Sequence, residues 1–410
     1  MAEDGTAVGW GSAPYEKTVF TPDGETEEET RFVRDFISRG IIVSPDGVTV
    51  PLVPEFDEYG GLSIASDIVK TNSGYTVVGQ VSTGIPADRQ ENIDDTCDGE
   101  DQPISVCIEA LHSSTAAHLF DTRAVKWSLD SNLNITNTEL LGLGLTPEED
   151  DDFAFISNAH AVNSNGIVVG SSDIRDHDRA ATIRSLPVYY KDGKVVEILN
   201  QDDDWTGGKA LAINANDVIV GYGIKVIDGA NRFKFFYHDI ASNSTVFPTD
   251  FFNSSASVGN DINDNGYIVG EGETDVFNVG SRRREGFLYK IGEDSITNLN
   301  DFLPCYEADG ETRYKYVVSE AKVINNNNEI FGVATKTVEK TDSLGGIVRD
   351  INGKIEYESI VVPVKLSPIN GEVESCTAPE TDTYERQSAS FPWYTLLLLP
   401  LVGLRRVLRN

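Results

Sequence analysis

The stretch from Asp261 to Gly266 carries the residue types of a calcium-binding loop. Asp261, Asn263 and Asn265 alternate before Gly266, which matches the opening pattern D-x-[DN]-x-[DN]-G, whose side-chain oxygens converge on one cation. The twelfth position of such a loop normally holds a bidentate Glu, and here it is Gly272. Related stretches of the chain place Ala where Asp261 stands. A structural turn is therefore the favoured interpretation, with calcium as the alternative.

The four cysteines are an even number, which suits two disulfides in an oxidising compartment. Cys97 and Cys107 would close a short loop, and Cys305 with Cys376 would tie the C-terminal end to the body of the protein. Sequence alone leaves the pairing open.

Two histidines near the first cysteine pair suggest a second use for it. Cys97, Cys107, His112 and His118 together have the composition of a Cys₂His₂ zinc site. Nine residues separate the two cysteines, whereas zinc sites usually space them by two to four. The disulfide is therefore favoured over zinc.

Familiar catalytic signatures are missing from the sequence. It contains no G-x-S-x-G, H-E-x-x-H, Walker loop or G-x-G-x-x-G. His160, His177 and His238 occur singly in or beside repeats, where exposed or satisfied histidines are usual. Trp205 follows a run of acids and is a weak candidate for stacking on a sugar. An enzymatic activity is therefore left uncertain and is not favoured.

Composition limits the class of protein and its partners. The 410 residues are 40% hydrophobic and 9% aromatic, which is ample for a packed core. Asp and Glu number 66 against 33 Lys and Arg, a formal net charge of −33. Such a surface repels nucleic acid and anionic lipid. We therefore expect a folded, acidic protein without a nucleic-acid partner.

A short motif with the consensus A-x-I-N-x-N-G-x-I-V-G recurs along the chain. It spans 161–170, 210–221, 259–270 and 321–332, with a looser copy at 68–79 and a partial one at 4–9. Each copy reads as two β-branched strands around a turn whose Asn and Gly tolerate positive φ. The closing Gly suggests a bulge or a close backbone approach. The turn residues that we single out are Asn163, Gly166, Asn214, Asn263, Gly266 and Asn325.

A second, aromatic hairpin follows each copy, so each repeat supplies four short strands. The clearest are at 187–199, 235–247 and 286–299, with others at 36–52 and 124–140, and the last repeat offers two candidates, 346–360 and 362–375. Repeats of about fifty residues with four antiparallel strands are typical of propeller blades. We predict an all-β, propeller-like ring of about six repeats over residues 1–376, interrupted by an insertion at about 81–123. An open stack of sheets is the alternative.

The first repeat begins in mid-unit and lacks its opening strand. Either a C-terminal strand completes it, or the natural chain continues upstream of Met1. We prefer the second, because Met1–Gly11 also has neither the basic nor the apolar region of an export signal.

The C-terminal end differs from the repeats. After a polar linker at 377–390, the run Phe391–Leu404 is apolar, and arginines follow it. As a helix, its fourteen residues reach about 21 Å, against a hydrocarbon core of about 30 Å. We predict a short hydrophobic helix over this run within a sorting or anchor segment, 391–410, that contacts the membrane. Its marker residues are Phe391, Trp393, Leu396, Leu399, Arg405 and Arg406.

This tail resembles the GlyGly-CTERM class of bacterial C-terminal sorting signals, although Ser388-Ala389-Ser390 replaces the Gly-Gly dipeptide. The resemblance implies export in a Gram-negative bacterium and a rhomboid-type sorting protease as partner. The recurring A-x-I-N-x-N-G-x-I-V-G motif resembles the HAF-type extracellular repeats and a related uncharacterised family with such tails. That resemblance implies localisation and architecture, and no particular chemistry.

The favoured function is a binding or adhesion module that is secreted or presented at the cell surface, with the 81–123 insertion as its largest recognition loop. One alternative is an extracellular hydrolase or lyase with carboxylates gathered at a channel mouth. Another is a structural envelope protein held by an uncleaved tail. Apart from the calcium alternative, we expect no cofactor.

Overall fold

The computed structural model describes residues 1–97, 102–113, 119–148, 151, 153–179, 182–275, 282–308, 311–314 and 316–370. The predicted linker and C-terminal segment, and with them the predicted short helix, lie outside these residues. Within them, strands form four four-stranded sheets, two three-stranded sheets and two separate hairpins. No helix in this part of the chain is long and apolar enough to cross a membrane.

Each of the four complete sheets is built from four consecutive antiparallel strands, paired in chain order. The second sheet contains β6 (Ser63–Thr71), β7 (Gly74–Gly84), β8 (Asp121–Asp130) and β9 (Ile135–Gly142). The third contains β10 (Ser157–Val162), β11 (Val168–Arg175), β12 (Ile183–Lys191) and β13 (Lys194–Glu197). The fourth contains β14 (Gly207–Ile213), β15 (Val218–Ile227), β16 (Ala230–Asp239) and β17 (Ser244–Val246). The fifth contains β18 (Ser257–Ile262), β19 (Tyr267–Glu273), β20 (Arg284–Lys290) and β21 (Thr297–Asn298).

The first sheet has three strands, β1 (Ala7–Gly11), β4 (Arg39–Val43) and β5 (Thr49–Leu52). Gly9 pairs with Ile41 as Gly170 pairs with Val188, so β1 occupies the second-strand position of a repeat. The described residues supply no first strand to this sheet, as the mid-unit start predicts.

The last sheet contains β24 (Tyr316–Ile324), β25 (Ile330–Glu339) and β26 (Tyr357–Leu366). Gly332 pairs with Val364, which assigns the third strand of this repeat to the 362–375 candidate. Most of the rival segment, 346–360, instead belongs to a loop between β25 and β26, held by isolated bridges such as Arg349 with Ile355, and only its last residues enter β26.

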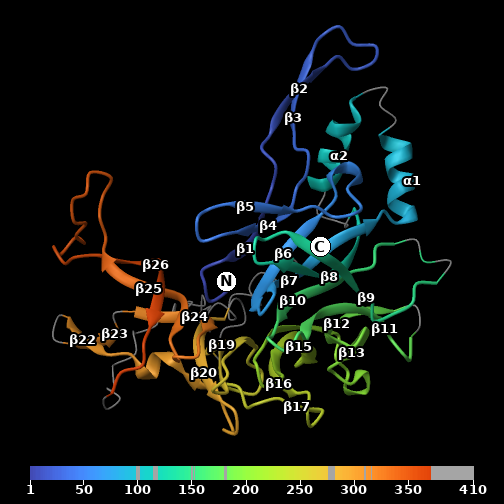
Figure 1. Cartoon of the computed structure of the whole chain (residues 1–410). Helices are drawn as coiled ribbons and strands as arrows, with labels where there is room; N and C mark the ends of the chain where they lie inside the picture. The colour runs from blue at the N-terminus through green and yellow to red at the C-terminus, as the bar shows by residue number, and fades with distance from the viewer. Residues whose placement is uncertain are drawn as a thin grey trace, which may run out of the picture.

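The sheets follow one another around a common centre, from blue to orange in Figure 1. The first strand of each sheet packs against the preceding sheet: β10 contacts β6, β7 and β8, and β14 contacts β10, β11 and β12. Apolar side chains fill the gaps, and the largest cluster joins Val78, Val169 and Ile219 from three consecutive sheets. This arrangement confirms the predicted all-β, propeller-like fold.

The closing glycine of the repeat is required by a bulge in the neighbouring first strand. In the third sheet the pairing shifts by one residue between Ala159 and Ala161, which pushes the backbone toward Gly170. A Cβ on Gly170 would lie 1.8 Å from the carbonyl oxygen of Asn158. Gly79, Gly221, Gly270 and Gly332 meet the same obstacle at 1.8–2.1 Å. The prediction of a bulge or close approach is confirmed.

The repeat asparagine closes its own turn and also joins neighbouring sheets. Asn163 Oδ1 accepts hydrogen bonds from the amides of Asn165 and Ile167, at 3.1 Å each, while its Nδ2 donates to the carbonyl of Asn214, 3.0 Å away in the next sheet. Asn163, Asn214 and Asn263 are all buried. Each turn is thereby fixed to the turn that follows it around the ring.

Two additions interrupt the repeats. The helices α1 (Ala87–Thr96) and α2 (Ile104–Ser113) lie between β7 and β8, where the insertion was predicted. The hairpin of β2 (Glu16–Phe20) and β3 (Glu29–Val33) rises beside them (Figure 1), and α2 contacts β3. Smaller elements are η1 (Glu58–Gly60), η2 (Gln201–Asp203), η3 (Leu299–Phe302), β22 (Cys305–Ala308) and β23 (Glu311–Tyr314).

Candidate binding site

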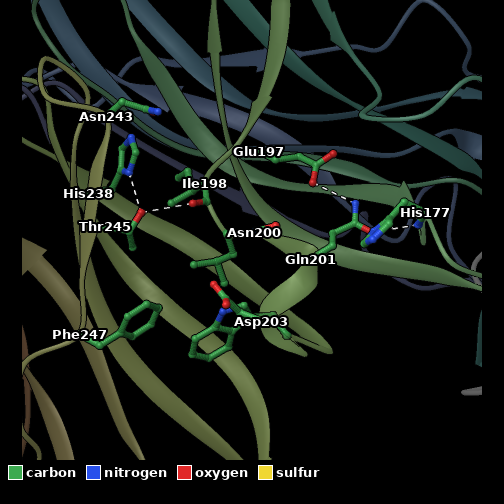
Figure 2. A pocket seen from close by; sticks show the side chains of 12 residues that line it. His177, Glu197, Ile198, Asn200, Gln201, Asp203, His238, Asn243, Thr245 and Phe247 are labelled. Carbon is green, nitrogen blue, oxygen red and sulfur yellow. Dashed lines mark hydrogen bonds between the residues drawn. The ribbon is translucent and has the colours of Figure 1, made fainter.

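A cavity of about 740 Å³ lies where the third and fourth sheets meet. One wall comes from the chain just after β13, including η2, and the other comes from the β16–β17 hairpin (Figure 2). Ile198 and Leu199 form the apolar base of the first wall and are buried. The site is therefore built on the edge strands of two sheets whose relative position the repeat fixes.

An aromatic pair forms the floor of the cavity. The rings of Trp205 and Phe247 stack with centroids 4.6 Å apart and an interplanar angle of 13°. Trp205 is 7% exposed, and a Cβ on Gly223 would lie 2.7 Å from its Cε3, so only glycine leaves room for the indole. Phe247 is 38% exposed. The ring available for stacking on a ligand is therefore Phe247, whereas the sequence had pointed to Trp205.

His238 comes from β16 and is 2% exposed. Its Nδ1 lies 2.9 Å from Thr245 Oγ1, and that hydroxyl donates to the carbonyl of Ile198 at 3.3 Å (Figure 2). Its Nε2 is buried and has no hydrogen-bond partner among the described residues. Burial lowers the pKa of His238, and Asp239 opposes that effect. The imidazole is thus neutral near pH 7.

Polar side chains form the rim. Gln201 Nε2 donates to Glu197 Oε2 at 3.0 Å, and Gln201 Oε1 accepts from the amide of His177 at 3.2 Å (Figure 2). His177 is thereby held beside the entrance. Because carboxylates and amides, but few cations, surround the cavity, its chemistry favours neutral or positively charged ligands over anions.

His177 also lies between two aspartates in an arrangement that resembles a metal site. Asp176, His177 and Asp178 each offer one ligand atom, and these atoms lie within 4.8 Å of one another. Asp176 is buried, however, and its carboxylate forms a salt bridge with Arg184 and accepts hydrogen bonds from the amides of Asp178 and Arg179. Its negative charge is therefore already compensated by protein groups.

The calcium-loop residues connect the fifth sheet to the sixth. Asp261 Oδ2 accepts from the amide of Ile324 at 2.8 Å. Asn263 and Asn265 direct their Nδ2 groups to Asn328 Oδ1, at 2.7 and 3.1 Å. These three side chains lie together, but they bind protein groups of the next turn, and two of them present amide nitrogens rather than the oxygens that calcium takes. The turn interpretation accounts for all three.

The first cysteine pair forms a disulfide, Cys97–Cys107, with Cα atoms 5.6 Å apart. This agrees with the disulfide that was favoured over zinc for these two cysteines, and it removes two ligands from the zinc alternative. His112 lies in α2, where burial lowers its pKa. His118, Cys376 and the side chain of Cys305 lie outside the described residues.

Two carboxylates of first strands bind backbone groups of the sheet that follows. Asp67 in β6 accepts from the amide of Val162 at 3.0 Å, just as Asp261 in β18 accepts from Ile324. Burial, with a contribution from Asp67, raises the pKa of Asp261 to about 7, although its backbone hydrogen bonds oppose the shift. Burial and Lys209 lower the pKa of His160 in β10 to about 4. Acids from non-adjacent sheets therefore approach one another here.

Sequence reasoning missed the set formed by His238, Thr245 and Phe247. All three belong to the aromatic hairpin predicted at 235–247, and His238 and Thr245 pair across β16 and β17. Alternation along the hairpin places His238 on the same face of β16 as Phe236, whose ring centroid lies 6.0 Å from that of Phe247, and this was a usable signal. The opposing wall, from Glu197 to Trp205, belongs to the preceding repeat, and no local pattern connects the two.

A family model described as "Protein of unknown function (DUF3466)" matches residues 1–407. No curated protein matches the chain. Among solved structures, the β-propeller domain of the Trilobed protease from Pyrococcus furiosus is 9% identical, with a TM-score of 0.37, over 90% of this chain and 97% of that one. Acylaminoacyl peptidase from Pyrococcus horikoshii is 10% identical, with a TM-score of 0.37, over 88% of this chain and 51% of the peptidase. TolB from Acinetobacter baumannii is 11% identical, with a TM-score of 0.30, over 75% of this chain and 68% of TolB.

Proposed function

We propose that this chain, which belongs to the DUF3466 family of proteins of unknown function, is a ligand-binding module whose ligand enters the cavity between the third and fourth sheets. The observation that carries the proposal is the buried, unpartnered Nε2 of His238 in the wall of that cavity. Buried polar atoms are normally satisfied, so one that lacks a partner, on a residue that lines an open cavity, points to a partner that arrives from outside.

The scaffold suits binding, because it holds the two walls in a fixed relationship. Asn163 ties the third sheet to the fourth through its bonds to the carbonyl of Asn214 and to Asp217 Oδ1, at 3.0 and 2.7 Å. Thr245 adds a second link through the carbonyl of Ile198 at the cavity itself. A preformed cavity with a stacking ring and a few placed polar groups is the usual form of a small-ligand site.

We further propose that the protein works outside the cytoplasm, either at the cell surface or after release. Three features support this location: the Cys97–Cys107 disulfide, the net charge of −33, and the tail with its resemblance to GlyGly-CTERM signals. A rhomboid-type protease and the export machinery would then be its processing partners. The resemblance of the repeats to HAF-type extracellular repeats agrees with this location.

The approach of Asp67 to Asp261 favours a second candidate, a hydrolase or lyase that acts at the centre of the ring. Each carboxylate already accepts two backbone hydrogen bonds. One comes from the neighbouring sheet, and the other comes from the next residue in the chain. Side chains that hold the first strands together are poorly placed for general acid–base work. Binding at the outer cavity is therefore our first choice. A structural envelope protein retained by an uncleaved tail is the third.

Isothermal titration with a panel of defined oligosaccharides and short peptides tests the proposal. We expect at least one probe class to bind the native protein, and Phe247→Ala to weaken that binding at least tenfold. The matched control is Phe32→Ala, which removes a 59% exposed ring on β3, far from the cavity in the chain. Failure of every probe, or binding that Phe247→Ala leaves unchanged, would contradict the assignment of this cavity.

A further inference from the structure

The hydrogen bonds around His238 determine which ring nitrogen carries the hydrogen. Thr245 Oγ1 has one hydrogen, and it donates that hydrogen to the carbonyl of Ile198. With its hydrogen on that carbonyl, the hydroxyl accepts from His238 Nδ1, 2.9 Å away, and this is the tautomer that we assign. The hydrogen of the neutral imidazole thus lies on Nδ1, which leaves a bare lone pair on Nε2.

His238 lines the cavity, and its Nε2 has no donor among the described residues. The ring that bears it is 2% exposed, and it also packs against Tyr189, with ring centroids 6.0 Å apart. Its orientation is therefore fixed by contacts on two sides. A buried acceptor of this kind selects a ligand group that donates a hydrogen bond.

We infer that the cavity takes a neutral, polyhydroxylated ligand of the sugar class, one hydroxyl of which donates to His238 Nε2 while an apolar ring face lies on Phe247. The inference rests on the proposed function, since it names the ligand class of the same site. The half-exposed ring of Phe247 supplies a flat apolar surface that complements the C–H face of a sugar.

The negative charge around the cavity disfavours anionic sugars. Glu197 and Asp203 line the cavity, and the chain as a whole carries −33. An ammonium group can donate to Nε2 but cannot accept a hydrogen bond, whereas a hydroxyl does both. Asn243, on the hairpin beside His238 (Figure 2), offers an amide N–H that a hydroxyl can accept. A hydroxyl of a neutral sugar therefore forms hydrogen bonds with both His238 and Asn243, whereas an ammonium group bonds only to His238.

Two substitutions of His238 separate the roles of its nitrogens. In His238→Gln, the side-chain oxygen takes the place of the Nε2 acceptor. In His238→Asn, the shorter amide takes the place of the Nδ1 donor to Thr245, and the cavity is left without an acceptor. The probes are cellopentaose, its amino counterpart chitosan pentaose, and the acidic pentagalacturonate. We expect the native protein to prefer cellopentaose, His238→Gln to retain binding within threefold, and His238→Asn to lose it at least tenfold.

The outcomes distinguish this inference from the proposed function. Equal binding by both variants, or a preference of the native protein for either charged probe, would overturn the inference, while a tenfold loss in Phe247→Ala would still uphold the cavity as the site. No effect of any cavity variant would overturn both. Nitrogen-15 NMR of histidine-labelled protein provides an independent readout: we expect hydrogen on Nδ1 and a bare Nε2 in the free protein. Hydrogen on Nε2 would contradict the inference whatever the binding data show.

Discussion

The side-chain amide of Asn214 donates a hydrogen bond to the main-chain carbonyl of Asn263, 3.1 Å away in the following sheet. Asn163 makes the same bond to Asn214, and Asn263 makes it to Asn325, at 3.0 and 2.9 Å. The asparagine of the repeat motif thus serves as a fastener between successive sheets. Its recurrence in the sequence reflects the ring as well as the local turn.

Replacing Asn214 by Asp tests this fastener. The carboxylate keeps the two acceptor bonds to the amides of Asn216 and Val218 but cannot donate to the carbonyl of Asn263. Because a buried acceptor is then left unpaired, we expect the free energy of unfolding to fall by about 1–3 kcal/mol in urea titrations. Ser164→Ala, at an exposed position of the equivalent turn in the third sheet, is the control and should change stability by less than about 0.5 kcal/mol. Equal stabilities of Asn214→Asp and the native protein would refute the fastener.

Replacing the closing glycine by alanine should be costly in a complete sheet and harmless in the first one. The added Cβ of Gly170→Ala would lie 1.8 Å from a carbonyl oxygen, so we expect a loss of about 1–3 kcal/mol or more. Gly9 occupies the same repeat position in β1, but an added Cβ there meets nothing within 4 Å. Gly9→Ala should therefore leave the urea midpoint almost unchanged. A large loss in Gly9→Ala would mean that another strand covers β1.

The buried carboxyl of Asp261 should make stability depend on pH. Its pKa is raised from 3.8 to about 7 in the folded protein, so the folded state holds a proton that the unfolded state releases between these values. Its contribution to stability is therefore complete below pH 4 and declines as the pH rises through 7, by roughly 1.4 kcal/mol per pH unit at most.

Asp261→Asn removes this titration while its side-chain oxygen can still accept from Ile324. We expect the stability of the variant, relative to the native protein, to rise between pH 4 and 7.5 in urea titrations at several pH values. Comparison with the native protein cancels the opposite effect of His160, whose lowered pKa destabilises the fold as the pH falls from 6.5 toward 4. Asp46→Asn, at an exposed turn, is the control for the loss of one carboxylate. A curve for Asp261→Asn that runs parallel to the native one would be the contrary result.

The proposed processing of the tail can be tested on protein recovered from its own cells. If the tail is a sorting signal, the intact mass should correspond to a chain that ends near Ser388, found at the surface or in the medium. A chain that retains Phe391–Asn410 in the membrane fraction would contradict processing and favour an anchored envelope protein.

Much of the fold could be predicted, because the repeat carries its own structure in its residues. Asn163 and Gly166 mark a turn, β-branched residues flank it, and Gly170 marks the bulge, so strand order followed from the period alone. The two helices of the insertion could not be predicted from the repeat, since they belong to none of its copies. Alternative strands in the last repeat had similar patterns, and only the pairing of Gly332 with Val364 separates them.

The hydrogen bonds between neighbouring sheets could not be predicted from the sequence. In three sheets a first-strand serine accepts a hydrogen bond from the preceding sheet, for example Ser157 from the amide of Ala124 at 2.9 Å. The fourth sheet has Gly208 at this position, and its neighbour is Pro187, which has no N–H to donate. This matched pair is evident only in three dimensions. The candidate site was missed for the same reason, because its two walls belong to different repeats.

Methyl NMR of the native protein titrated with cellopentaose would test the central claim most directly, because it locates the ligand as well as detecting it. Ile198, Leu199 and Thr245 supply methyl groups to the proposed cavity, whereas Leu288 and Ile330 supply them to a second cavity of about 490 Å³ between the fifth and sixth sheets. We predict saturable shifts at Ile198, Leu199 and Thr245, with Leu288 and Ile330 unmoved. Shifts confined to the second cavity, or none at either, would contradict binding between the third and fourth sheets.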